Sequence, residues 1–411
     1  MKILTFSAYY SPEIAASMYL TEDILEAMAM DGNDIELFVP TPCRGIDYKI
    51  RKKYKHIKTE TMYNGRLTIH RFSLFRERKN IFFRFFRYML LILVFLWKGL
   101  RTDTDIIFAQ STPPIQGMMA GFLASVKKVP FVYNLQDIFP DSLVNSNITT
   151  KGSLMWKIGR VIEDYSYKKA EKIIVISDDF KKNLIMKGVS SEKIVVVPNW
   201  ADLKNVSPIS RKDNEIVKKY NLDLKKFYIV YSGNIGYTQN FDLLLNVASK
   251  VEQNNPEILF VLIGDGAAKK EICDRIEKEK RKNIIVLPFQ TYENIDSVFS
   301  LGDVGLIISK PGVGNNSVPS KTWGIMAAER PILASFDEKS DLANLIKKIN
   351  CGLVVNAGDE KKLYDAIKFL YENRKKIKCE GRNGRKYVIE NLNKEKGTIK
   401  YLEILRGCFN E

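Results

Sequence analysis

Short runs of apolar, mostly β-branched residues alternate with helical patterns along the whole chain. Each run is apolar at nearly every position, which is typical of strands that are buried on both faces. Such strands form parallel sheets, with helices covering both faces. The sequence therefore predicts an α/β fold with strands at residues 2–6, 34–39, 105–109, 130–134, 172–176, 194–197, 227–231, 258–263, 284–287, 304–308 and 331–334.

This alternation lapses near the middle of the chain, over residues 198–210, where prolines appear. The predicted strands fall into one group on either side of that stretch, and 411 residues are enough for two or three domains. Two doubly wound domains joined by a short linker imply a cleft between them. In sheets of this kind ligands bind at the carboxyl ends of the strands, so we expect functional residues in the loops that follow strands.

The chain is strongly basic, with a formal net charge of +16. Such an excess attracts polyanions: nucleic acid, an anionic membrane face or phosphorylated substrates. No recognisable nucleic-acid-binding module accompanies the charge. The apolar run that follows Met1 is too short for a signal peptide.

Cysteine and histidine are scarce and scattered, so we expect no metal site. The five cysteines are odd in number and form no C-x-x-C pair, which fits a reducing cytosol better than a disulfide framework or a structural zinc. The two histidines, His56 and His70, lie away from any glycine-rich turn and supply neither a Ser-His-Asp triad nor a histidine-ligated metal.

Two loops in the first half carry candidate residues. After the first strand, Ala15 and Ala16 lead to Ser17, a good helix cap whose neighbouring N–H groups could meet a phosphate; an ordinary capped helix explains the same residues. After the strand at 130–134, Asp137 and Asp141 could orient sugar hydroxyls or transfer protons, although aspartate is also common in solvated turns.

Three loops in the second half follow strands directly. In "SGNIGYTQ" the glycines, Gly236 among them, let the backbone approach a ligand, while Asn234 and Gln239 can donate hydrogen bonds to phosphate oxygens; the P-loop pattern is absent. Asp265 lies in a Gly-Asp-Gly turn that a tight turn alone would explain. Phe289 offers a ring on which a base could stack, and a core aromatic is the rival interpretation.

The stretch "SVPSKTWGIMAAERPILAS" reads as a loop, a helix and a buried strand. Ser320 and Lys321 fall at the predicted helix start, where backbone N–H groups and the helix dipole favour an anion. Lys321 adds a full positive charge at the same point. This stretch therefore predicts an anion site.

A basic and aromatic segment, "RERKNIFFRFFRYMLLILVFLWKGLR", occupies the first half. Its continuous apolar run, residues 88–97, is shorter than the roughly 20 residues that a membrane-spanning helix needs. Bulky apolar residues beside basic ones are typical of a helix that lies on an anionic membrane, whereas a core helix with a basic solvent face is the alternative. The residues expected to contact the membrane are Phe82, Arg84, Phe85, Phe86, Arg87 and Trp97.

Three motifs, in this order and at domain-consistent spacing, resemble family 4 of the glycosyltransferases. They are "VISDDFKKNLIMKGVSSEKIVVVPNWAD", "VYSGNIGYTQNFDLLL" and "SVPSKTWGIMAAERPILAS". The resemblance implies the GT-B fold, two doubly wound Rossmann-like domains facing across a cleft. Residues 1–203 would form the acceptor-side domain, residues 204–385 the nucleotide-sugar domain, and a C-terminal helix over 386–411 would pack back on the first.

Members of this family transfer a sugar from a nucleotide-sugar with retention of the anomeric configuration and without a required metal or other cofactor. The resemblance implies that Asp137 and Lys321 are catalytic, that the loop at Ser17 closes over the donor, and that Phe289 meets the base. The donor-binding residues implied are Ala16, Ser17, Asn234, Gly236, Gln239, Asp265, Phe289, Ser317, Val318, Ser320 and Lys321.

The sequence departs from the family pattern at five positions. Many members have an Arg and a Lys where this chain has Asn234 and Gln239, and two Glu residues where it has Asn316 and Gly324. The usual Gly before "x-P" is Glu329. Contacts that those basic and acidic residues make to the donor therefore cannot be carried over.

The Pro-Ser-Lys variant resembles a branch that makes bacterial capsule, O-antigen or exopolysaccharide, including transferases of N-acetylated amino sugars such as N-acetyl-fucosamine. That branch implies a UDP-linked donor, a polyprenyl-diphosphate-linked acceptor and a peripheral place on the cytoplasmic face of the membrane. A nucleotide-sugar epimerase of the same fold and a non-catalytic protein that binds anionic membranes or polymers are the alternatives.

Overall fold

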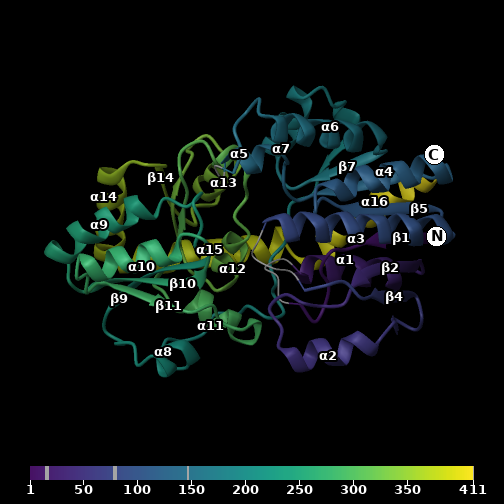
Figure 1. The fold of residues 1–411 in the computed structure, drawn as a ribbon. Coiled ribbons are helices and arrows are strands. Elements are labelled where there is room, and N and C mark those ends of the chain that lie inside the picture. The colour runs from purple at the N-terminus through teal and green to yellow at the C-terminus, as the bar shows by residue number, and fades with distance from the viewer. Residues whose placement is uncertain (14–17, 77–80, 146–147, 411) are drawn as a thin grey trace. The chain divides into compact units, whose positions relative to one another are not determined.

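The computed structural model describes residues 1–411 apart from 14–17, 77–80, 146–147 and 411 (Figure 1). The described chain forms two compact units, each built on its own sheet. The first unit comprises Met1–Val144, Ile148–Asn199 and Glu395–Glu411, and the second includes Trp200–Lys394.

The first sheet has eight strands in the order β3-β4-β2-β1-β5-β6-β7-β8. Its neighbouring strands are parallel except for β3 and β4, which form a hairpin. Parallel neighbours need long crossovers, which here are mostly helices. The strands are β1 (Lys2–Phe6), β2 (Asp34–Pro40), β3 (Thr59–Met62), β4 (Leu67–Phe72), β5 (Ile106–Gln110), β6 (Phe131–Leu135), β7 (Lys172–Val175) and β8 (Ile194–Val196).

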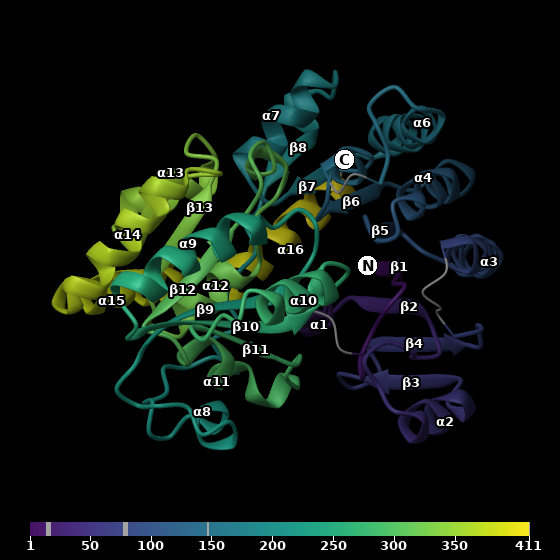
Figure 2. The ribbon, with the colours of Figure 1, turned by 60° about the vertical axis from the view of Figure 1, so that its left-hand side comes forward.

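Helices cover both faces of this sheet (Figure 2). One face carries α1 (Met18–Met30), α7 (Asp178–Met186) and α16 (Lys394–Asn410). The other carries α3 (Ile81–Arg101), α4 (Ile115–Lys127) and α6 (Leu154–Lys169). Shorter elements complete the unit: α2 (Tyr48–His56), α5 (Asp141–Asn145) and η1 (Ser191–Lys193).

The C-terminal segment is two helices rather than the single one predicted over 386–411. α15 (Arg374–Asn391) belongs to the second unit, and α16 packs in the first. Tyr401 of α16 is buried, its hydroxyl donates to Asn134 Oδ1 at 3.1 Å, and its ring meets Phe108 edge-on. α16 is therefore an integral layer of the first unit although it is the last helix of the chain.

The second sheet has six parallel strands in the order β11-β10-β9-β12-β13-β14. The strands are β9 (Phe227–Asn234), β10 (Ile258–Asp265), β11 (Ile284–Leu287), β12 (Val304–Ile308), β13 (Ile332–Phe336) and β14 (Gly352–Asn356). The helical elements are α8 (Glu215–Lys219), α9 (Phe241–Asn254), α10 (Lys269–Lys278), η2 (Tyr292–Asn294), α11 (Ile295–Ser300), η3 (Gly314–Asn316), α12 (Lys321–Ala327), α13 (Asp341–Ile349), α14 (Glu360–Glu372) and α15.

Successive residues of the central strands supply separate apolar cores. Phe227, Ile229 and Tyr231 enter one core, whereas Tyr228 and Val230 enter another. A strand that is buried on both faces must be apolar at successive positions, which is the pattern seen in the sequence.

Every strand predicted from the sequence is present, within one to three residues at its ends, so the α/β fold is confirmed. Three strands were missed: β3, β4 and β14. β3 is largely exposed and polar, and β4 buries only alternate residues. The Asn64–Gly65 pair, with φ of 55° and 84°, makes the turn between them and was the available hairpin signal.

Candidate functional site

Two of the predicted donor-binding loops, those after β9 and β10, meet at the carboxyl edge of the second sheet. β9 and β10 run in register to their ends, with Asn234 paired to Asp265. Just beyond, the Ile235 N–H donates to the Asp265 carbonyl at 2.8 Å. The two glycine-containing loops are thus joined by a backbone hydrogen bond.

Glycine is required where these two loops touch. A Cβ on Gly264 would lie 1.9 Å from the Gly233 carbonyl oxygen, and one on Gly266 would lie 2.2 Å from that of Ile235. Both distances are far below any real Cβ contact. The tight contact between the two loops explains these glycines, because only glycine lets the backbones approach this closely.

Gln239 holds its own loop in place. Its Oε1 accepts a hydrogen bond from the Gly236 N–H at 3.0 Å, and its Nε2 donates to Thr238 Oγ1 at 2.9 Å. Asn234 is exposed at the end of β9. The two amides that stand in place of basic residues therefore differ, because only Asn234 presents its side chain to solvent.

Lys321 is the first residue of α12 and reaches back to the end of β9. Its Nζ lies 3.4 Å from the centre of the Tyr231 ring and 3.3 Å from the Cβ position of Gly233. Burial lowers the pKa of this ammonium well below its usual range, and no described carboxylate forms an ion pair with it. The ammonium thus stands beside the backbone of the Gly233 turn, a position that suits an anionic ligand.

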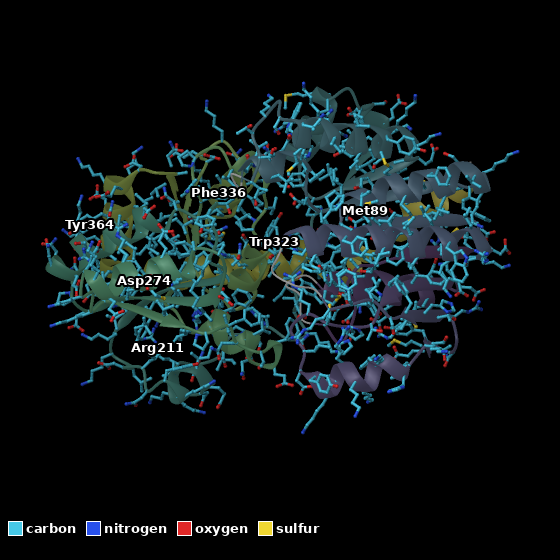
Figure 3. All side chains as sticks on the ribbon, viewed as in Figure 1. Met89, Arg211, Asp274, Trp323, Phe336 and Tyr364 are labelled. Atoms are coloured by element: carbon cyan, nitrogen blue, oxygen red, sulfur yellow. The ribbon has the colours of Figure 1, made fainter. Side chains whose placement is uncertain are left out.

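Ser320 caps α12 without a side-chain hydrogen bond to the helix. Instead, Thr322 donates from its N–H (3.0 Å) and its hydroxyl (2.7 Å) to the Pro319 carbonyl. Ser317 and Val318 precede this turn and are partly buried. Trp323, labelled in Figure 3, is buried within α12.

The loop before Ser317 is anchored by a carboxylate that the sequence did not single out. Asp337 accepts from the N–H of Gly312 at 3.0 Å and of Gly314 at 2.7 Å. A Cβ on Gly314 would also meet Asp337 and Phe336, which is labelled in Figure 3. The glycine-rich stretch is thus fastened at its centre to the end of β13.

Gly324 occupies a position where the family commonly has a glutamate. A Cβ there would lie 2.3 Å from the Phe299 ring. No side chain fits at residue 324 unless Phe299 moves, so the departure from the family pattern is built into the packing. Glu329, where the family has glycine, adopts a left-handed φ of 58°.

Phe289 is 60% exposed on the loop after β11. The alternative interpretation, a core aromatic, is therefore wrong. The ring is available for a planar ligand.

In the first unit, Asp137 and Asp141 are not equivalent. Asp141 forms an ion pair with Lys187 at 2.8 Å, and Lys187 also meets the buried Glu163 at 2.8 Å. Asp137 is exposed and has no ion pair among the described residues. Asp137 is therefore the carboxylate that can act on a ligand.

Glu13 organises the first post-strand loop and was missed by the sequence reasoning. Its carboxylate is buried and accepts from the N–H groups of Cys43 (2.7 Å), Arg44 (2.9 Å) and Tyr10 (3.2 Å). Nothing in the sequence signals that these three donors converge. Ala16 and Ser17, which follow in this loop, lie outside the described residues.

The predicted membrane segment forms α3. Phe85, Phe86 and Trp97 are exposed, as is Arg84, while the side chain of Phe82 is outside the described part of the structure. Arg87 needs correction: it is only 2% exposed, and it donates to the Phe75 carbonyl and to Cys43 Sγ. Arg87 holds two loops together inside the unit and does not belong to the surface.

Among the described residues, no group of three or more His, Cys, Asp or Glu is arranged to hold a metal ion. Within the same residues, no helix is both long and apolar enough to cross a bilayer.

Two family models match, one to each half of the chain. Residues 19–205 match the model described as Glycosyltransferase Family 4, and residues 212–387 match Glycosyl transferases group 1. The putative colanic acid biosynthesis glycosyl transferase WcaI of Escherichia coli is 22% identical over 358 residues, which are 84% of this chain and 86% of WcaI. The probable glycosyltransferase WbjE of Pseudomonas aeruginosa is 25% identical over 252 residues, 60% of this chain and 61% of WbjE.

Solved structures share the fold over nearly the whole chain. Anabaena Alr3699/HepE in complex with UDP and glucose has a TM-score of 0.73 at 16% identity and covers 99% of both chains. Sucrose-phosphate synthase from Thermosynechococcus elongatus has a TM-score of 0.74 at 14% identity, covering 100% of this chain and 99% of its own. These neighbours have the GT-B fold, so the predicted fold is confirmed.

Proposed function

Since the chain belongs to the family 4 glycosyltransferases, we propose that it moves a sugar from a nucleotide diphosphate-sugar to a lipid-linked glycan acceptor in bacterial surface-polysaccharide synthesis. The observation that carries the proposal is Lys321, a partly buried ammonium without a carboxylate partner among the described residues, held against the Gly233 turn. A single unpaired cation beside exposed backbone suits the diphosphate of the donor.

In this proposal Lys321 and Ser320 bind the diphosphate and stabilise the charge that develops as it leaves. Fixed donors aimed at developing charge are the main electrostatic device of group transfer. Asn234 adds a neutral donor at the same edge, and Phe289 stacks on the base. The HepE complex with UDP and glucose supports UDP as the nucleotide.

Asp137 acts at the acceptor in the proposed reaction. Its carboxylate is exposed and free of ion pairs among the described residues, so it is available to a hydroxyl group of the acceptor. It accepts the proton of the attacking hydroxyl or orients that hydroxyl. We further propose retention of the anomeric configuration and no requirement for a metal ion.

The acceptor is proposed to be polyprenyl-diphosphate-linked, and the sugar an N-acetylated amino sugar. The colanic acid assignment of WcaI supports a surface-polysaccharide context. The basic charge and the exposed apolar residues of α3 support a peripheral place on the cytoplasmic face of the membrane.

Incubation of the protein with a panel of labelled UDP-hexoses and UDP-N-acetylhexosamines, in excess chelator, tests this function. We expect UDP release, with the anomeric configuration of the product retained by nuclear magnetic resonance. Epimerised donor without transfer would identify an epimerase instead. Absence of turnover and of binding with every donor would refute the proposal.

A further inference from the structure

Helix α3 is apolar on both sides rather than on one. Its inner side buries Leu91 and Phe95 against the sheet, and its outer side exposes an apolar stripe. That stripe follows the spacing of a helix face, so it is a continuous surface. It consists of Phe86, Leu93, Trp97 and Leu100.

The two neighbouring helices expose apolar stripes as well. α4 exposes Phe122 and Val126, four residues apart on one side of the helix. α6 exposes four apolar side chains, each 48–75% exposed, whose spacing is that of one helix face. They are Leu154, Met155, Ile158 and Val161.

Close packing joins the three helices into one layer. A Cβ on Gly99 of α3 would lie 2.6 Å from a Leu123 methyl group of α4, and one on Gly121 of α4 would lie 2.8 Å from Lys169 Cβ of α6. Lys127 Nζ at the end of α4 donates to the Leu100 carbonyl of α3 at 3.3 Å. Figure 2 shows α6, α4 and α3 in a row over one face of their sheet. The three stripes therefore belong to a single face, which we call the three-helix face.

Acidic side chains are almost missing from this face. Residues 81–101 and 115–127 contain no Asp or Glu. On α6, Glu163 is buried and Asp164 is paired with Arg160 at 2.6 Å. Basic side chains border the face instead: Lys98 and Arg101 lie over the Trp97 ring, 4.9 and 4.4 Å from its centre.

We infer that the three-helix face is one docking surface for an anionic lipid bilayer, with α4 and α6 contributing as much apolar surface as α3. Apolar stripes bordered by cations and lacking acids are complementary to acyl chains beneath phosphate headgroups. The inference rests on the proposed lipid-linked acceptor and deepens it, because α6 also supports the Asp137 loop. A Cβ on Gly159 of α6 would lie 2.7 Å from Pro140 and 2.9 Å from Phe139.

Vesicle co-sedimentation tests the face. The wild-type protein is mixed with vesicles of phosphatidylglycerol and phosphatidylcholine, and with vesicles of phosphatidylcholine alone. The variant is the triple Phe122→Ser, Ile158→Ser, Val161→Ser. The control is Met30→Ser, Met186→Ser, whose side chains are more exposed, at 75% and 80%, and lie on α1 and α7. We expect the triple variant to partition onto anionic vesicles at least about tenfold less, and the control to bind within about twofold of wild type.

Binding of UDP and thermal unfolding are measured on the same preparations to show whether the triple variant is folded. If it is unfolded, Leu154→Ser replaces it, because Leu154 is 75% exposed at the end of the α6 stripe. Pelleting of the folded triple variant like wild type would overturn the inference, as would failure of wild type to bind anionic vesicles. A wild-type dimer that the triple variant breaks would mark the face as a protein interface. Donor turnover on a water-soluble acceptor reports on the proposed function separately.

Discussion

Replacing Lys321 with methionine removes one charge and little else. The methionine chain keeps the apolar stem that runs past Gly233 and over the Tyr231 ring. A charge-assisted contact to phosphate contributes about 1.5–3 kcal/mol in mutational series. Since 1.4 kcal/mol is a tenfold change in affinity, Lys321→Met should raise the dissociation constant of UDP by about 10- to 100-fold.

Lys321→Met should weaken UDP binding but should not lower the stability of the folded protein. Burial lowers the pKa of Lys321, so its amine binds a proton more tightly in the unfolded chain than in the folded protein. Protonation therefore lowers the free energy of unfolding. This cost to stability is fully present below the folded pKa and disappears as the pH rises toward the unfolded value near 10.5. The methionine variant escapes the cost, so its melting temperature at neutral pH should equal or exceed that of wild type.

Isothermal titration with UDP and differential scanning calorimetry check the two parts, with Lys339→Met as an exposed-lysine control in the same unit. Unchanged UDP affinity in a folded Lys321→Met variant would refute the assignment of the diphosphate to Lys321.

Three further predictions concern single residues. Phe289→Ala should weaken UDP binding about tenfold in titration without lowering the melting temperature, because the ring is 60% exposed. A large loss of stability would show instead that the ring packs in the core. Glu380 is 1% exposed, and its Oε1 lies 3.8 Å from Lys376 Nζ, beyond hydrogen-bond distance. Desolvation raises the pKa of Glu380 against the lowering effect of Lys376, so the free energy of unfolding falls as the pH rises from the unfolded value of about 4.3 through the folded one. Glu380→Met should therefore add about 2 kcal/mol in urea unfolding at pH 7.5 and remove that pH dependence, and an equal effect at pH 4 would contradict the cause. Gly324→Ala should cost about 2 kcal/mol because its Cβ would lie 2.3 Å from Phe299, whereas Gly407→Ala, with nothing within 4 Å, should be neutral or stabilising; similar losses in both would point to helix effects alone.

The sequence predicted what local pattern determines. Continuous apolar runs located the buried strands, and the glycines that follow β9 and β10 marked the edge where those strands end side by side. Lys321 was found because a cation followed a proline turn at the start of a helix. The exposed stripe of α3 was visible as a dense series of phenylalanines, and its partners on α4 and α6 were not, because their apolar residues look like ordinary core positions.

Contacts between distant segments could not be predicted in this way. Tyr231 lies under an ammonium that is 90 positions away in the chain, and its hydroxyl donates to the Asn234 carbonyl at 2.5 Å. Arg87 reads as one more surface cation among the phenylalanines, but the fold turns it inward onto a backbone carbonyl. The amide of Gln239 looked free to meet phosphate, yet it closes its own loop.

The proposed diphosphate site lacks the family's usual basic pair, because Asn234 and Gln239 stand at those positions. Gln239 is occupied by Gly236, and Gly324 has no room for a side chain, so neither can replace the missing charges. In the proposed site Lys321 is then the main source of attraction beside the neutral donors Ser320 and Asn234, and its environment suits that role. A partly buried ammonium without a carboxylate partner among the described residues destabilises the empty protein and is stabilised by an added anion. A salt bridge within the protein would have been the more stable arrangement for folding. Its absence at the Gly233 turn is the physical reason to place the leaving diphosphate there.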